Sequence, residues 1–200
     1  MRRVITGVAA LLFALVVQAQ VALDSVGRDA AYVATIITRS QKIVDGLQLQ
    51  DAETKAQVLN IIANRYFLLS DLEKRHGKGD ALDASLYKHH FELVADLSNY
   101  LDEQQVEAVK DGLTYGVVPK TYGAYLEMIP SLKENEKLQI MNWLKEAREF
   151  AIDAGDAKAK HGWFNKYKGR INNWLSKRGY DLTLERKAWG DRIAAQQKNK

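Results

Sequence analysis

The chain of 200 residues lacks cysteine altogether and contains only two prolines. Without cysteine it can form no disulfide, offer no thiolate to a metal ion and carry no lipid on a cysteine. It also lacks a glycine-rich phosphate loop, a His-Glu-x-x-His pair and a Gly-x-Ser-x-Gly turn. The fold must therefore be stabilised by its hydrophobic core, and we expect no dedicated metal site and no cofactor.

The first residues have the pattern of a targeting segment. Arg2 and Arg3 precede an apolar run of about fourteen residues from Val4 to Val17, shorter than the roughly 20 that span a bilayer. Val17-Gln18-Ala19 then offers the small residues that a signal peptidase requires. We predict a signal peptide over residues 1–19 and an exported mature protein, periplasmic or secreted, without stable membrane insertion. The alternative is an N-terminal membrane anchor.

Charge is divided unevenly along the rest of the chain. Residues 20–155 contain 15 basic and 21 acidic side chains, whereas residues 156–200 contain 12 basic and four acidic ones. The basic end can dock on the acidic body or face an anionic partner. Because an exported protein rarely meets nucleic acid, we expect no nucleic-acid partner and favour an acidic glycan or the cell envelope.

Apolar residues recur with helical spacing almost throughout, and no stretch keeps the two-residue alternation of a strand. The sequence predicts an all-α fold. A single-domain bundle of about seven helices covers residues 20–182, and a loosely attached basic helix or tail covers residues 183–200. The expected helices run over residues 29–46, 51 to about 75, 81–100, 102–113, 120–128, 131–154 and 157–177, with a last one over 183–197. Asp51 is expected as an N-cap, and Asp102 with Gln105 and Ser131 with Glu134 as capping boxes.

The segment from Thr114 to Pro130 interrupts the helical pattern. Pro119 is expected to hold Val118 in an extended conformation, so that an irregular connection precedes a short helix beginning at Lys120. Irregular connections that are rich in rings often carry function. Tyrosines in this segment are therefore candidates for a binding site, with simple filling of the space between helices as the alternative.

Aromatic side chains gather in the second half of the chain. Residues 110–181 hold ten of the 18 aromatic side chains, and from Lys160 to Trp174 rings are mixed with basic and amide groups. Arg and Lys donate several hydrogen bonds, Asn both donates and accepts, and a flat ring can lie against the C–H face of a sugar. This mixture favours a site for a polar ligand, with carbohydrate as the leading case. We expect about half of the rings, led by Phe150, Phe164, Tyr167 and Trp174, to be core residues.

The candidate binding residues lie around a predicted turn at Gly155 and in the tyrosine-rich connection. Glu149 and Asp153 are four residues apart and therefore share a helix face. The alternatives are a solvated charged face before the turn and a basic amphipathic helix docked on the acidic body after it. Whether Arg148, Asp153, His161 and Arg170 line one cavity decides between these interpretations. The full candidate set is Tyr115, Tyr122, Arg148, Glu149, Asp153, His161, Trp163, Lys168, Arg170 and Asn173.

Two long blocks of the sequence resemble a bacterial family known as domain of unknown function 3826. The resemblance extends weakly back to about Tyr32 and is expected to end near Leu182. It implies an exported, sugar-binding protein of polysaccharide-degrading bacteria, and it transfers no catalytic residue. The first block is Val109-Lys110-Asp111-Gly112-Leu113-Thr114-Tyr115-Gly116-Val117-Val118-Pro119, with Tyr122, Tyr125 and Met128-Ile129-Pro130; the second includes Glu146-Ala147-Arg148-Glu149, Asp153-Ala154-Gly155 and Lys166-Tyr167-Lys168-Gly169-Arg170-Ile171-Asn172-Asn173.

Three functions remain open at this point. The first is an exported protein that binds an oligosaccharide or polysaccharide in a compact polar and aromatic cleft. The second is a periplasmic helical chaperone or envelope-stress protein, because the helix start at Leu101–Gln105 loosely resembles theirs. The third is a lyase on acidic glycans, in which Arg170 neutralises a carboxylate and His161 or Tyr115 removes a proton.

Overall fold

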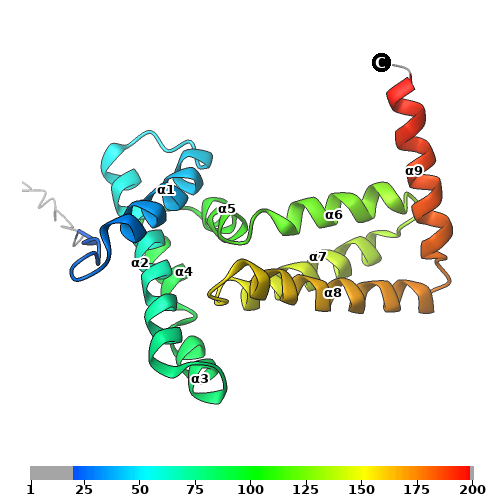
Figure 1. Ribbon diagram of the computed structural model, residues 1–200. Helices are drawn as coiled ribbons and strands as arrows, with labels where there is room; N and C mark the ends of the chain where they lie inside the picture. Colours follow the sequence, from blue (N-terminus) through cyan, green and yellow to red (C-terminus); the bar gives the residue numbers. More distant parts are fainter. Residues whose placement is uncertain (1–19, 199–200) are drawn as a thin grey trace, which may run out of the picture.

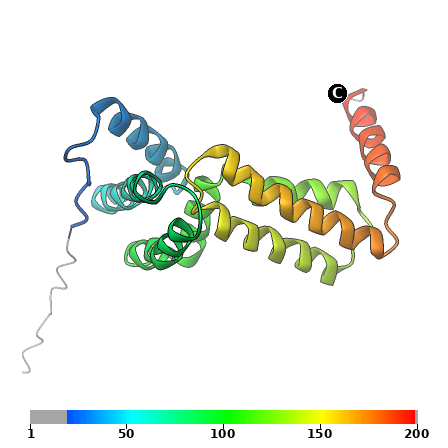
Figure 2. The same cartoon turned by 60° about the horizontal axis from the view of Figure 1, so that its bottom comes forward.

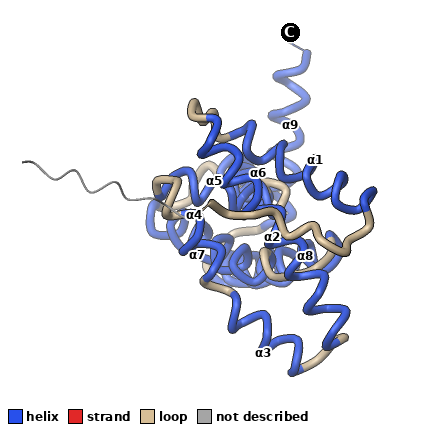
Figure 3. The backbone as a smooth tube through the Cα atoms, turned by 90° about the vertical axis from the view of Figure 1, so that its left-hand side faces the viewer, coloured by secondary structure: helices blue, strands red, loops and turns tan. Residues whose placement is uncertain are grey.

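The computed structural model describes residues 20–198, and throughout this range the chain forms helices, turns and loops without a strand (Figures 1 and 3). The predicted all-α class is confirmed, with nine helices in the described range instead of about seven. The predicted signal peptide lies outside the described residues. The helices are α1 (Ala30–Gly46), α2 (Ala52–His76), α3 (Asp80–His89), α4 (Glu92–Leu97), α5 (Glu103–Leu113), α6 (Val117–Met128), α7 (Glu134–Ala151), α8 (Ala157–Lys177) and α9 (Leu182–Lys198).

Acidic side chains cap two helices where the sequence predicted them. The Asp51 carboxylate accepts a hydrogen bond from the Thr54 backbone N–H at 2.6 Å, which satisfies a donor at the start of α2. Asp102 and Gln105 form a reciprocal capping box before α5.

The start of α7 differs from the prediction. The capping box expected from Ser131 and Glu134 is wrong, because the helix begins at Glu134 and Lys133 is its N-cap. The Lys133 backbone N–H donates to the Glu136 carboxylate at 2.9 Å. A turn after α6, closed by the Leu132 N–H to the Ile129 carbonyl, delays the helix.

The single helix expected over residues 81–100 is two helices, α3 and α4. The break falls at His90 and Phe91, where the His90 backbone N–H bonds to the Tyr87 carbonyl three residues back. Such tighter bonding is common where a helix ends. The break leaves the His90 imidazole against Asp153, far away in the sequence.

Pro119 does not hold Val118 in an extended conformation, and that prediction is wrong. Pro119 lies in the first turn of α6, where a missing N–H removes no intrahelical hydrogen bond. The irregular segment is therefore limited to residues 114–116. Its sharp turn is made by two successive left-handed residues, Tyr115 with φ 61° and Gly116 with φ 63°.

The helices form two groups at opposite ends of an elongated arrangement (Figures 1 and 2). Each group buries a main hydrophobic core. Helices α6, α7 and α8 lie side by side and bury one core between them, with Ile140, Leu144, Phe164 and Ile171 among its members. Helices α1, α2, α4 and α5 bury the other, which includes Val58, Ile62, Leu97 and Val109. Ile152, just after α7, belongs to this second core and so ties the two together.

Helix α9 crosses the far end of α6 and α8 (Figure 1). It has no buried residue, but it is attached through Arg192, whose guanidinium donates to the Glu127 carbonyl at 2.7 Å and to the Met128 carbonyl at 3.1 Å. Within residues 20–198, no helix combines the length and the apolar character needed to cross a membrane.

Candidate functional site

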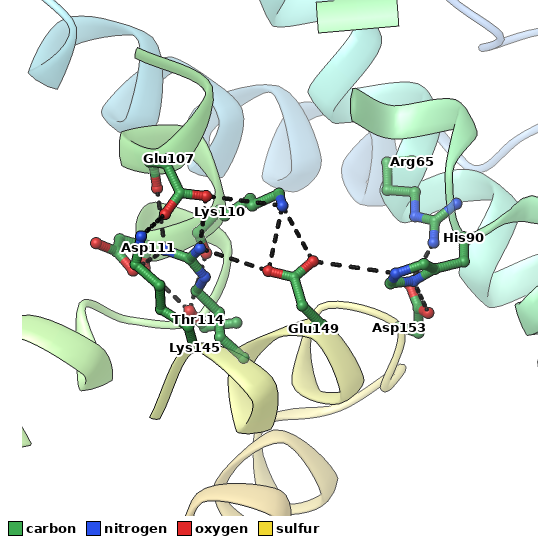
Figure 4. A network of polar contacts seen from close by, with 10 residues as sticks. Arg65, His90, Glu107, Lys110, Asp111, Thr114, Lys145, Glu149 and Asp153 are labelled. Carbon is green, nitrogen blue, oxygen red and sulfur yellow. Dashed lines mark hydrogen bonds and ion pairs between the residues drawn. The ribbon is translucent and has the colours of Figure 1, made fainter. Parts of the chain in front are cut away.

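A network of charged side chains fills the junction between the two cores (Figure 4). Its centre is Arg148 of α7, a largely buried guanidinium that reaches across to α5. Arg148 Nη1 lies 2.7 Å from Asp111 Oδ1, and Nη2 lies 2.7 Å from Glu107 Oε1. Each Nη group binds a different carboxylate, and these two contacts fix the orientation of the guanidinium plane. Arg148 therefore holds α7 against α5.

The ion pairs set the protonation state of the site. Burial alone would raise the pKa of Glu107, but hydrogen bonds from Arg148 and Lys145 outweigh it and lower the pKa to about 2. Burial would likewise lower the pKa of Arg148, whereas Glu107 and Asp111 raise it. Glu107 and Arg148 are therefore charged at neutral pH and are already paired, which makes neither a ready proton donor or acceptor.

The network continues towards α2 and the break between α3 and α4. Glu149 Oε2 lies 3.0 Å from Lys110 Nζ and 4.0 Å from His90 Nε2. The other ring nitrogen, His90 Nδ1, lies 2.7 Å from Asp153 Oδ2. Asp153 Oδ1 also pairs with Arg65, a buried residue of α2. Glu149 and Asp153 thus connect the α7 end to the N-terminal helices.

A cleft of about 330 Å³ opens beside Asp153, between α3 and the corner formed by α7 and α8. Asp83 and Tyr87 of α3 contribute to its lining together with Phe150 and Trp163. The Phe150 and Trp163 rings are stacked, with centroids 4.7 Å apart and planes at 19°. Tyr87 is 72% exposed, and Asp83 forms no ion pair with any described residue. The cleft therefore combines aromatic walls with carboxylates.

A wider groove of about 560 Å³ lies on the other side of Arg148. Its lining includes Glu103, Glu107 and Asp111 of α5 and Lys145 of α7. The carboxylates of Glu107 and Asp111 are both engaged by Arg148, and Lys145 Nζ lies 2.7 Å from Glu107 Oε2. The charges of this groove that are nearest to the network are therefore satisfied within the protein.

The predicted candidates that belong to the network or the cleft are Arg148, Glu149, Asp153 and Trp163. Arg148 lines the wide groove, whereas Asp153 and Trp163 line the aromatic cleft. Arg148 is buried and paired, so its contacts are those of a residue that joins two helices.

The other candidates lie elsewhere. His161 stacks on Tyr115, with centroids 5.5 Å apart, and this pair closes the turn before α6 against the start of α8. Arg170 is exposed and stacks on Trp143, 4.6 Å from the ring centroid. Tyr122 packs on the core of α6–α8, and Asn173 is exposed on α8.

Arg148, Asp153, His161 and Arg170 are thus not brought together in one of the cavities described. Lys168 faces a third cavity, between α6, α8 and α9. Among the rings expected in the core, Phe164 and Tyr167 are buried, but Phe150 is 46% exposed and belongs to the cleft. The prediction for Phe150 is wrong because its helix position faces the corner beside α3, where no further helix covers it.

Several residues of the site gave no signal in the sequence. His90, Tyr87 and Asp83 come from the α3 region, more than 60 residues before Asp153. Lys160 was also missed: its ammonium is buried and donates to the Ala151 carbonyl at 3.2 Å, at the end of α7. Burial lowers the pKa of Lys160 to about 8, opposed by Asp153.

The described residues thus form an all-helical protein whose two cores meet at a charged junction. An aromatic cleft borders this junction. The chain belongs to the family described as protein of unknown function (DUF3826), which it matches over residues 76–195. The match continues past Leu182, so the expected end of the resemblance is wrong and most of α9 belongs to the shared region. No curated protein matches the chain. Residues 20–198 contain no group of three or more carboxylate or imidazole side chains suited to a metal ion.

Proposed function

We propose that this protein binds a carbohydrate in the cleft between α3 and the α7–α8 corner. The observation that carries the proposal is the stacked pair of Phe150 and Trp163 beside the carboxylates of Asp83 and Asp153. A cavity of about 330 Å³ is within the range of small-ligand sites. It is large enough for a sugar ring and open enough for a chain of them to continue outward.

The rings supply the apolar part of such a site. Aromatic faces carry partial negative charge and attract the positively polarised C–H groups of a sugar ring. Phe150 is 46% exposed and Tyr87, on the α3 side, is 72% exposed. Leaving large rings in water on both sides of a cleft gains nothing for folding. A ligand that covers them gains their burial.

The polar groups favour a neutral sugar over an acidic one. Carboxylates accept hydrogen bonds from hydroxyl groups, and Asp83 has both oxygens free of ion pairs within the described chain. The Asp153 carboxylate contacts Arg65 and His90, which fix its position in the cleft. A uronic acid in this cleft would place a third carboxylate next to these two, at an electrostatic cost.

A chaperone remains the alternative that one specific observation favours. Tyr87 and Phe91 form an exposed aromatic pair with centroids 6.2 Å apart, and such a patch can hold an unfolded segment. The lyase hypothesis has less support. Arg170 and His161 are nine residues apart on α8, about 13 Å along the helix axis, so they do not act on one sugar unit together.

Saturation-transfer NMR of the mature chain with neutral and acidic oligosaccharides of matched length tests the proposal. We expect transfer to neutral ligands and its loss in Trp163→Ala, with Trp174→Ala as the matched control on the same helix. Suppression of client aggregation without transfer to any sugar would support the chaperone instead. Transfer only to acidic sugars would overturn the assignment of the ligand to this cleft.

Export is part of the same proposal. It is supported by the two arginines, the apolar run and the small residues ending at Ala19. N-terminal sequencing of the protein recovered from its own cells tests it. A mature terminus near Gln20 is expected, and recovery of an intact terminus in the membrane fraction would favour an anchor.

A further inference from the structure

A second cavity, remote from the aromatic cleft, lies where α9 crosses α6 and α8. Its volume is about 210 Å³, enough for a single small ring. Helix α6 contributes Thr121 and Tyr125, α8 contributes Lys168 and Asn172, and α9 contributes Arg186 and Trp189. Three helices are therefore needed to complete it, and one of them is the helix that crosses the end of the bundle (Figure 1).

Hydrogen bonds between α9 and the end of α6 hold the walls of the cavity together. The Trp189 indole N–H donates to Glu127 Oε2 at 3.2 Å, and Arg192 donates to the carbonyls at the end of α6. These bonds hold α9 against α6 and orient the Trp189 ring at the edge of the cavity. These contacts engage Arg192, Glu127 and the indole N–H of Trp189, and they do not involve Lys168, Arg186 or Thr121.

Two basic side chains of the lining lack an ion pair with any described residue. Within residues 20–198, neither Lys168 nor Arg186 forms an ion pair. Their basic neighbours differ: Arg170 lies 3.5 Å from Glu146, and Arg178 lies 3.6 Å from Glu136. Two basic side chains of the C-terminal part that form no ion pair within residues 20–198 thus lie together at this cavity, where they attract an anion.

The neutral polar groups of the lining can form hydrogen bonds with the hydroxyl groups of a ring. The Tyr125 hydroxyl donates to Asn172 Oδ1 at 2.7 Å. Because burial raises the pKa of Tyr125 to about 12, the hydroxyl stays protonated and keeps this bond at neutral pH. With Oδ1 occupied, the Asn172 amide presents its N–H groups to a ligand, and the Thr121 hydroxyl can both donate and accept.

We propose that the cavity between α6, α8 and α9 binds a small carboxylate-bearing, hydroxylated ring of the hexuronate class. Lys168 and Arg186 hold the carboxylate, Asn172 and Thr121 bind hydroxyl groups, and Trp189 with Met128 covers an apolar face. Arg186 is the better partner for the planar carboxylate because its donors form a fork. This site is independent of the aromatic cleft and does not rest on the function proposed for it.

Titration of the full mature chain with galacturonate, galactose and acetate tests the proposal. The readout is the change in the NMR chemical shifts of the α8 and α9 backbone. Galacturonate and galactose differ at the carboxylate, whereas acetate lacks the ring. We expect galacturonate to bind at least roughly tenfold more tightly than either. Equal binding of galactose, equal binding of acetate, or no shift with galacturonate would each overturn it.

Charge variants locate the site. Lys168→Met and Arg186→Gln should each weaken galacturonate binding by roughly fivefold or more. Lys177→Met on α8 and Lys187→Gln on α9 are the matched controls, since both are exposed and lie outside the cavity. Trp163→Ala should leave this binding unchanged, which separates the site from the aromatic cleft. Unchanged affinity in both cavity variants would contradict the assignment.

Discussion

Arg148 Nη1 of α7 lies 2.7 Å from Asp111 Oδ1 of α5, and this contact of a buried guanidinium with a partly buried carboxylate joins the two cores of the protein. The same guanidinium also pairs with Glu107, so two carboxylates of α5 are held by one side chain. Of the charged side chains in the network, Arg148 is the least exposed, which makes its removal the most costly.

Arg148→Ala should lower the free energy of unfolding by about 3 kcal/mol or more, because Asp111 loses its ion pair and Glu107 keeps only its lysine partners. Chemical denaturation followed by circular dichroism measures the change. Arg170→Gln is the matched control: its guanidinium is exposed, and a surface ion pair contributes only about 0–1 kcal/mol. Equal losses in the two variants would show that the junction does not depend on Arg148.

The contribution of Glu107 to the free energy of unfolding should be lost at acid pH. Its pKa is lowered to about 2, below the ordinary 4.5, so its contribution is present above pH 4.5 and is lost as the pH falls through 2. Because the side chain is partly exposed, we expect a loss of only about 1–2 kcal/mol. The wild type should therefore exceed Glu107→Gln in unfolding free energy at neutral pH, with the difference shrinking at acid pH. A difference that does not change with pH would contradict the ion pair.

Gly112 permits the close approach of α5 to α1. A Cβ added there would lie 2.9 Å from Ile43 Cγ2, too close for two carbon atoms. Gly112→Ala gains about 1 kcal/mol of helix propensity but overpacks by about 1–3 kcal/mol, so a net loss of stability is expected. Ile43→Ala removes both γ carbons that the added Cβ would meet, so Gly112→Ala should cost less in the Ile43→Ala background than in the wild type. Stabilisation by Gly112→Ala alone would show that α1 moves freely.

Tyr115 has φ 61°, a conformation that costs a residue with a Cβ about 1 kcal/mol. Tyr115→Gly should therefore be more stable than Tyr115→Ala by roughly that amount, although both lose the stacking on His161. Thermal unfolding of the two variants measures the difference. The reverse order would mean that the turn relaxes when the ring is removed.

Helical periodicity and local caps were sufficient to predict the fold class and most helix positions. The Asp102–Gln105 capping box is an example, because both partners lie within one turn of the chain. The conformation at Pro119 was predicted wrongly, since a proline looks the same in sequence whether it stops a helix or begins one. Tertiary packing decides whether such a proline stops a helix or begins one, and the local sequence pattern does not show this packing.

The site was predicted only in part. Trp163 and Asp153 belong to the cleft, as the local mixture of rings and charges suggested. Their partners Tyr87, Asp83 and His90 could not be inferred, because the break between α3 and α4 that presents them depends on tertiary contacts. Lys168 was a candidate, but its cavity needs Arg186 and Trp189 from α9, a helix that the sequence placed outside the domain.

Calorimetric titration of the protein with a neutral oligosaccharide, repeated on Trp163→Ala and Trp174→Ala, tests the proposed carbohydrate-binding cleft most directly. Trp174 is a suitable control because it packs against Trp143, away from the cleft. We predict saturable binding to the wild type and to Trp174→Ala, and a loss of at least roughly tenfold in affinity in Trp163→Ala with little change in thermal stability. Equal affinity in all three proteins, or no binding to any neutral sugar, would contradict the proposed site.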